Sequence, residues 1–318
     1  ETITYLAGHG SHHTVTLKDL TRETKYFYTC GEDSSMSEVY HFNTPRNADS
    51  EEPIRLAVFG DMGYLDSVTR RMGILGSVTM SNNWSATFSR ELLEDMKDND
   101  EIDMIWHVGD VGYADDAAFH TIKTAVTFEY EGAYNGYMNW IQNLTNTLPY
   151  HVSVGNHESE CHDPACVLRF KELGKPLSNF TAFNSRWHMP SPESGGVLSM
   201  WYSWNYGAVH FTNIDTSTDY PNAPEGEKGD SGIFDAGHFA TDGEYLEWVE
   251  RDLKAAHDDP NIKWILAGGH RPFSFDDPDY AQLETLFEKY GVAMYFAGHS
   301  HSYSRFSAED NKGIIHIT

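Results

Sequence analysis

The stretch "IDMIWHVGDVGY", residues 102–113, decides the fold class. Its first seven residues form an apolar run typical of a buried strand, and a Gly-Asp pair follows directly. The same order, an apolar run and then glycine with a polar residue, recurs at four other places. The other runs are "IRLAVF" (54–59), "YHVSV" (150–154), "IKWILA" (262–267) and "AMYFA" (293–297). We therefore expect five buried strands that all end in the same way.

Amphipathic stretches separate these runs. "SRELLEDM" (89–96), "GEYLEWVERDLKAAH" (243–257) and "YAQLETLFEKYG" (280–291) carry apolar residues at helical spacing. Strands that alternate with helices predict an α/β domain. The segment "MWYSWNYGAVHFTNID" (200–215) instead indicates two strands joined at Tyr206-Gly207, so part of the sheet should be antiparallel.

The first residues have a different pattern. "HTVTLKDL" (13–20), "TKYFYTCG" (24–31) and "VYHFNTP" (39–45) are short β-branched and aromatic runs, which predict strands. The spacing of Leu20, Thr24 and Tyr26 is typical of the tyrosine corner of a β-sandwich. Three runs are too few for a whole sandwich. We expect a partial β domain at residues 1–47, a polar linker that begins in "TPRNADSEEP", and an α/β domain at residues 48–318.

Composition limits the partners. The chain has 318 residues, 40% of them hydrophobic, so it can bury a large core, and no window of about 18 consecutive apolar residues predicts a membrane span. Its formal net charge of −26 argues against nucleic acid or an anionic membrane as a partner. A small anionic substrate remains compatible if the pocket has positive charge of its own, which a metal would supply.

The polar residues after the five strands are the candidate site. In open α/β sheets, ligands bind outside the carboxyl ends of the strands, so we expect these residues to converge. Each fragment has a simpler interpretation, because Gly-Asp after a strand is usually a turn and a lone histidine is usually on the surface. Together they offer seven oxygen and nitrogen donors, which suit two metals that share a bridge better than one zinc. The donors are Asp61, Asp110, Tyr113, Asn156, His270, His299 and His301.

The ordered motifs "GDMG", "GDVGY", "GNHE", "GGH" and "GHSH" resemble those of the metallophosphoesterases, and among them the purple acid phosphatases of the large fungal and plant type. The resemblance covers residues from about 54 to 318, and the upstream segment is similar to the fibronectin-III-like domain of those proteins. Most metallophosphoesterases have histidine where this chain has Gly63. Purple acid phosphatases lack that histidine and have a tyrosine at the position of Tyr113.

The resemblance implies a metallophosphatase αββα sandwich with mixed sheets and a role for each donor. Asp61, Tyr113 and His301 would bind Fe(III); Asn156, His270 and His299 would bind a divalent zinc, iron or manganese; and Asp110 would bridge the two. A phenol has a pKa of about 10 in water, so Tyr113 needs a strong cation to ionise near neutral pH.

The implied activity is hydrolysis of phosphate monoesters at acid pH, with in-line attack on phosphorus by a hydroxide held at the metals. His157 would contact phosphate or protonate the leaving group; alternatively it only orients the ligand loop. Two other functions stay open, a metallophosphoesterase of other specificity (a phosphodiesterase or nucleotidase) and a secreted glycoprotein that binds metal without turnover.

The sequence differs from the family pattern in a segment that would bind the substrate. Plant members carry histidines shortly after the fourth-strand ligand, whereas this chain has "RPFSFDDPDY" (271–280) and no histidine before His299. Arg271, or an acid such as Asp276, are the alternatives in this segment. We expect His107, within a strand, to be structural and His9, His12 and His13 to be solvated.

The location is indicated by cysteines and sequons. Cys161 and Cys166 in "CHDPAC" can close a short disulfide loop, Cys30 has no partner, and Asn83, Asn143 and Asn179 begin glycosylation sequons. These features favour a secreted glycoprotein over an acidic cytosolic enzyme with reduced cysteines. The incomplete sandwich and the final strand "KGIIHIT" (312–318), which lacks a closing element, predict that the chain is part of a longer protein.

Overall fold

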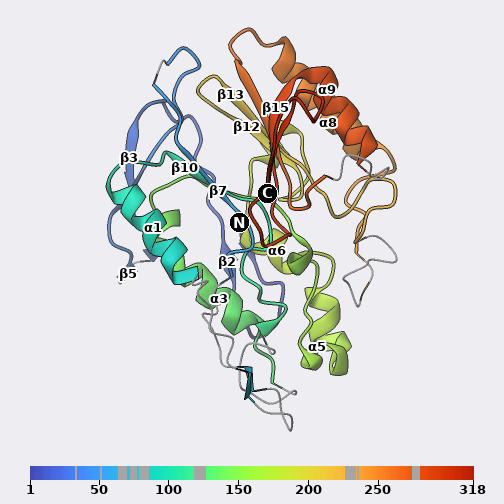
Figure 1. Ribbon diagram of the computed structural model, residues 1–318. Helices are drawn as coiled ribbons and strands as arrows, with labels where there is room; N and C mark the ends of the chain where they lie inside the picture. The colour runs from blue at the N-terminus through green and yellow to red at the C-terminus, as the bar shows by residue number, and fades with distance from the viewer. Residues whose placement is uncertain are drawn as a thin grey trace.

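The structure is a computed structural model that describes residues 1–32, 34–50, 52–63, 70–71, 77–78, 86–117, 127–225, 234, 236–273 and 280–318. Two sheets lie side by side at its centre (Figure 1). The first has the order β11-β10-β7 and is parallel, with β7 at Leu56–Phe59, β10 at Met104–His107 and β11 at Tyr150–Val152.

The second sheet has six strands in the order β12-β13-β14-β15-β17-β16 and is mixed. β13, β14, β15 and β17 run parallel, while β12 and β16 pair antiparallel at the two edges. The strands are β12 Tyr202–Tyr206, β13 Val209–Asn213, β14 Trp264–Gly268, β15 Val292–Phe296, β16 Arg305–Phe306 and β17 Ile315–Ile317. The predicted α/β class, the mixed sheets and the hairpin at Tyr206-Gly207 are confirmed.

Helices cover the outer faces of both sheets (Figure 1). α1 (Ala86–Asp98) and α3 (Tyr130–Trp140) lie beside the three-stranded sheet, and α8 (Glu244–Asp258) and α9 (Ala281–Tyr290) beside the six-stranded one. α9 ends at Gly291, whose φ of 73° is the left-handed conformation that favours glycine at a helix end. The remaining helical segments are α4 Gln142–Thr145, η2 Asn156–Glu158, α5 Pro164–Leu168, η3 Phe170–Gly174, η4 Lys175–Leu177, α6 Thr181–Arg186 and α7 Ser191–Ser194.

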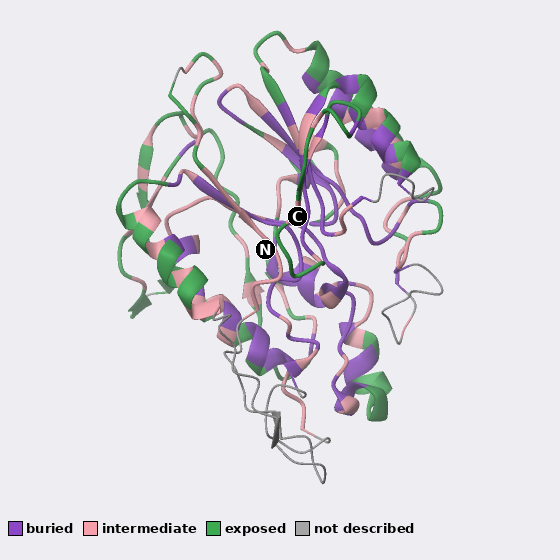
Figure 2. Cartoon of the chain, viewed as in Figure 1, coloured by how far each residue is buried: buried purple, intermediate pink, exposed green. Residues whose placement is uncertain are grey.

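Apolar side chains fill the space between the sheets. Trp106 of β10 is fully buried and meets Phe211 of β13 and Phe296 of β15 edge-on. Ile105, its neighbour in the chain, points the other way and packs with Leu93 of α1. Strand β10 is buried on both faces, as Figure 2 shows for the centre of the molecule. This packing fixes the carboxyl ends of the two sheets relative to each other.

The N-terminal segment is a set of short hairpins. β1 Thr2–Ile3 pairs with β2 His12–His13, β3 Lys25–Tyr28 with β6 Tyr40–Asn43, and β4 Gly31–Glu32 with β5 Ser35–Met36; β8 Arg70–Arg71 and β9 Ser77–Val78 form a further pair within the α/β part. The Tyr26 hydroxyl accepts the N–H of Thr21 at 2.8 Å, the backbone contact that a tyrosine corner requires. The sandwich class and the boundary at residue 47 stay predictions.

The strand expected over residues 13–20 is wrong, because β2 ends at His13. Val15 and Leu17 are 81% and 53% exposed. A β-branched run forms a strand where it packs against a half-buried sheet surface, and this run has none among the described residues.

Three further expectations have outcomes here. Cys161 and Cys166 form a disulfide as predicted, and Cys30 is a free, exposed cysteine. Within the described residues, no helix combines the length and the apolar character that a membrane crossing needs. The predicted linker contacts the α/β part through Arg46, whose guanidinium forms an ion pair with Asp103 at 2.9 Å.

Candidate metal centre

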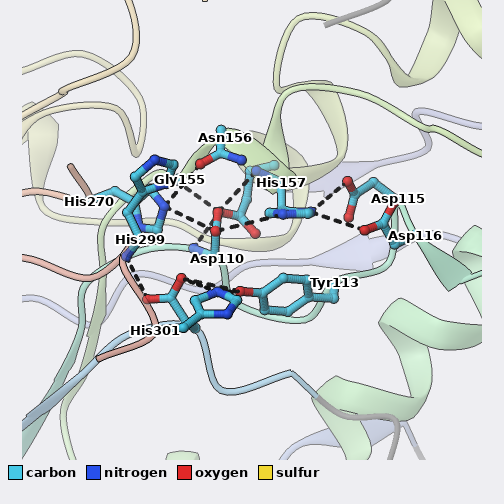
Figure 3. Close-up of polar contacts among 12 residues, drawn as sticks. Asp110, Tyr113, Asp115, Asp116, Gly155, Asn156, His157, His270, His299 and His301 are labelled. Carbon is cyan, nitrogen blue, oxygen red and sulfur yellow. Dashed lines mark hydrogen bonds and ion pairs between the residues drawn. The ribbon is translucent and has the colours of Figure 1, made fainter. Parts of the chain in front are cut away.

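All seven predicted ligand residues meet at the carboxyl ends of five strands, and Figure 3 labels each of them except Asp61. Asp61 follows β7, Asp110 and Tyr113 follow β10, and Asn156 begins η2 after β11. His270 follows β14, and the last two residues, His299 and His301, follow β15. Each therefore lies where a buried strand leaves the sheet, and both sheets contribute.

The first half of the cluster contains a phenol, a carboxylate and an imidazole. The Tyr113 hydroxyl lies 2.7 Å from Nε2 of His301 and 3.2 Å from Oδ1 of Asp61. His301 Nε2 lies 3.1 Å from the same carboxylate oxygen. These three residues are the set that the family resemblance assigned to Fe(III).

The second half is more deeply buried. His270, which is fully buried, places Nε2 at 3.0 Å from Oδ2 of Asp110 and at 3.1 Å from Oδ1 of Asn156. The ring of His299 lies against that of His270, with ring centres 5.1 Å apart. His270, Asn156 and His299 are the residues that the family resemblance assigned to the divalent metal.

Asp110 belongs to both halves. Its carboxylate lies with ligand atoms of His270 and His299 inside one group 4.8 Å across, and with those of Asp61 and His301 inside a second. Two metal-sized groups that share one carboxylate fit a dinuclear centre with a bridging ligand. Carboxylate and phenol oxygens in one half, and imidazoles with an amide in the other, suit a harder and a softer cation.

Several residues of this cluster have a strained backbone conformation. Five of the seven predicted ligand residues have positive φ, namely Asp61, Asp110, Tyr113, His299 and His301. Side chains disfavour this conformation, and such strain persists where the surrounding structure holds a functional arrangement in place. Two glycines allow the close approach: a Cβ at Gly155 would lie 2.3 Å from Oδ1 of Asp110, and one at Gly298 would lie 2.4 Å from Oδ2 of Asp61.

Glu158 is one of two residues that the sequence analysis missed; the other is Asp115. Glu158 is buried, and its carboxylate accepts the N–H groups of Asp110 at 2.9 Å, Val111 at 2.8 Å and Gly155 at 2.9 Å. It thus joins the loops that follow β10 and β11. The only sequence signal was its place in "GNHE", three residues after a glycine that ends a strand.

The pKa values reflect burial and close opposite charges. Burial alone would raise the pKa of Asp110, but His270 holds it well below its usual range, while the same pair raises the pKa of His270 to about 9 against the effect of burial. Burial, and then the charge of Asp110, raise the pKa of Tyr113 far above 10. The phenol therefore stays protonated unless a strong cation binds it. Burial, and then Arg271, lower the pKa of His299 to about 4.

His157 lies beside the cluster and is held by a second carboxylate. Its Nδ1 lies 2.8 Å from Oδ2 of Asp115, its Nε2 lies 4.0 Å from Oδ2 of Asp110, and its ring packs against Tyr113 (Figure 3). Burial would lower the pKa of His157, but Asp115, followed by Asp110 and Asp116, raises it to about 10. His162 shares Asp115, with Nδ1 at 2.9 Å.

The structure also gives the positions of most other residues that the sequence analysis named. His107 is structural as predicted: it is buried, and its Nδ1 lies 2.9 Å from the Tyr150 hydroxyl. Burial lowers the pKa of His107 to about 3. His9 and His13 are exposed and His12 is half-buried. Arg271 lies beside His299, and Asp276 and Asn83 lie outside the described residues.

Comparison with known families agrees with this geometry. Residues 54–303 match the calcineurin-like phosphoesterase family, and residues 1–44 match the N-terminal domain of purple acid phosphatases. The chain is 32% identical to acid phosphatase A of Cryphonectria parasitica over 94% of its own length and 65% of the relative's. It is 27% identical to purple acid phosphatase 15 of Arabidopsis thaliana, over 92% of its own length and 49% of the relative's. The chain thus spans about half to two thirds of these relatives.

Solved structures show the same fold. A purple acid phosphatase from yellow lupin seeds superposes with a TM-score of 0.63 at 19% identity, over 95% of this chain and 50% of the lupin chain. A dimetal phosphatase from Danio rerio superposes with a TM-score of 0.53 at 15% identity, over 84% of this chain and 87% of the other.

Proposed function

Since the chain belongs to the calcineurin-like phosphoesterase family, which implies a dinuclear metal centre, we propose that it is an acid phosphatase of the purple acid phosphatase type. It would hydrolyse small phosphate monoesters at acid pH and release phosphate. The carboxylate of Asp110, shared by the two ligand groups, is the observation that carries this proposal.

The residues present fit the two metals. Asp61, Tyr113 and His301 would hold Fe(III), since the Tyr113 phenol, whose pKa is raised by burial, would need a strongly charged cation to ionise. Asn156, His270 and His299 would hold a divalent zinc, iron or manganese, with Asp110 common to both. When bound, the metals would activate water and stabilise negative charge on the phosphoryl group.

The role of the chain is to position donors and protons around that centre. Asp115 accepts the Nδ1 proton of His157, so the other ring proton lies on Nε2, the nitrogen nearest to Asp110. With a pKa raised to about 10, His157 stays protonated at acid pH. We assign it to contact the phosphate or to donate the Nε2 proton to the leaving alcohol.

A secreted, glycosylated protein is part of the proposal. The disulfide between Cys161 and Cys166 supports an oxidising location. Asn143 is exposed at the start of its sequon, whereas Oδ1 of Asn179 accepts the N–H of Gly237 at 2.7 Å, so Asn143 is the better glycan acceptor.

The test is a substrate panel with metal analysis and a visible spectrum. We expect hydrolysis of monoesters in preference to diesters and nucleotides, with two metals per chain and a visible absorption band that disappears in Tyr113→Phe. Preference for diesters would indicate the phosphodiesterase alternative. Metal binding without turnover would indicate the non-catalytic one, and a colourless active protein with zinc alone would remove the Fe(III) assignment.

A further inference from the structure

Arg271 is a cation fixed at the edge of the candidate metal centre, in the segment where the sequence departs from the plant pattern. Its backbone N–H donates to Thr216 Oγ1 at 2.9 Å, and its carbonyl accepts the Tyr295 hydroxyl at 2.8 Å. The side chain is only 15% exposed. Both backbone and side chain are therefore held in place next to His270.

The guanidinium has two partners among the described residues. NH2 donates to Oε1 of Glu225 at 2.7 Å, and Glu225 is itself 1% exposed. NH1 lies 3.0 Å from Nε2 of His299. The buried Nε has no hydrogen-bond partner within the described part of the chain. A buried donor without a partner is uncommon, and it leaves the guanidinium with hydrogen-bonding capacity that these two contacts do not use.

The contact with His299 and the binding of a metal exclude each other. A guanidinium only donates, so Nε2 of His299 must be the unprotonated nitrogen in this contact. A neutral imidazole has one such nitrogen. If a metal binds Nε2, the acceptor is lost; if it binds Nδ1, the ring proton lies on Nε2, which then cannot accept. In either case NH1 of Arg271 is released.

We infer that Arg271 binds phosphoryl oxygens of the substrate and of the phosphate product once metal has occupied His299. Loading frees NH1, and Glu225 keeps the guanidinium in position through NH2. A guanidinium N–H donates a charge-assisted hydrogen bond to an oxyanion. In a chain of net charge −26, such a fixed cation would also favour the approach of an anion. This assignment rests on the proposed function and names a substrate-binding residue for it.

The experiment measures binding of inorganic phosphate by calorimetry to the metal-loaded protein, with metal content determined for each variant. We expect Arg271→Gln to weaken phosphate binding on the order of 10–100-fold at equal metal content, because a charged hydrogen-bonding partner is lost. Arg251→Gln is the matched control: it removes one positive charge from the exposed surface of α8 and should leave the affinity unchanged. Arg271→Lys, which keeps the charge without the planar guanidinium that Glu225 orients, should be intermediate.

A second measurement tests the exclusion itself. In a Zn²⁺ titration, Arg271→Gln should bind zinc at least as tightly as the original chain, because NH1 no longer competes for His299. Phosphate affinity unchanged in Arg271→Gln, or no phosphate binding by the metal-loaded chain, overturns the inference. If the protein hydrolyses esters but phosphate binding does not depend on Arg271, the proposed function stands and the inference fails. If phosphate binding depends on Arg271 but no ester is hydrolysed, the proposed function fails and the inference stands.

Discussion

Asp110 carries more of the candidate site than any other residue. It lies in both ligand groups, accepts the backbone N–H of His157 at 3.0 Å, and pairs with His270. Its own backbone has φ of 50°. The sequence predicted its position from a Gly-Asp pair after a buried run, since a strand end is the place where an α/β sheet exposes polar groups. The resemblance, and not the spacing, supplied its bridging role.

Residues that hold the metal-ligand loops and His157 in place, without being predicted metal ligands themselves, were harder to predict. Asp115 and Glu158 touch His157 and the motif loops, but neither stands at a strand end. Their role depends on which loops become neighbours in space. The amino-acid sequence by itself does not contain this information. Arg271 was an open alternative for the same reason, because its contact with His299 joins residues 28 positions apart.

His157→Ala should lower turnover while leaving the metal content unchanged. The ring lies next to the cluster but outside both ligand groups, and it holds a proton on Nε2. Loss of a general acid typically costs about 10²–10⁴-fold in rate. Steady-state kinetics across the acid range, with metal analysis, measure this. Asp115→Asn keeps the His157 ring but removes the carboxylate that favours its protonated form, so it should give a smaller loss of turnover. Unchanged kinetics in both variants would show that His157 is only a structural residue.

At the scale of elements, the α/β part was predictable and the N-terminal part only partly so. Strands such as β10 are continuous apolar runs and helices such as α8 have apolar residues at helical spacing, and burial in the core enforces both patterns. The run at residues 13–20 is β-branched, as strands often are, but Val15 is 81% exposed and has no sheet surface to pack against among the described residues. Strand formation there is decided by tertiary context, which composition does not contain.

The loops after β10 and β11 should separate when Glu158 is changed. In Glu158→Gln, an amide nitrogen would face backbone N–H groups that now donate to a carboxylate. An unsatisfied buried donor costs about 1–3 kcal/mol, so we expect a lower melting temperature and weaker metal retention. Thermal unfolding and metal analysis test this. Glu288→Gln on the exposed face of α9 is the control, and equal behaviour of the two variants would show that Glu158 does not join the loops.

At the scale of the whole molecule, one buried acid links stability to pH. Asp215 is fully buried after β13, and burial raises its pKa to about 7 in spite of hydrogen bonds from Thr218 and Ser217. In the unfolded chain its pKa is about 4. Between these values the folded state holds a proton that the unfolded state has lost, so the free energy of unfolding falls as pH rises from about 4 to 7.

Asp215→Asn should remove that dependence. A shift of about three units corresponds to roughly 4 kcal/mol, so the original chain should lose stability relative to the variant across this pH range. Chemical denaturation at pH 4, 5, 6 and 7 measures the difference. The exposed Asp242→Asn is the control and should run parallel to the original chain. A difference between Asp215→Asn and the original chain that stays constant with pH would show that Asp215 is ionised in the folded state.

The two sheets should be held together by the metals as well as by the core. Asp61, Asp110, Tyr113 and Asn156 come from loops of the three-stranded sheet, and His270, His299 and His301 from loops of the six-stranded sheet. A ligand that binds only the folded state stabilises it by about 3 kcal/mol at a hundredfold excess over its Kd. Chelation should therefore lower the melting temperature by several degrees, and added metal should restore it. Asp110→Ala, which lacks the shared carboxylate, should melt at the same temperature with and without chelator. If the original chain loses both metals with no change in melting temperature, the centre contributes nothing to the association of the sheets, and the packing of Trp106 between them is sufficient.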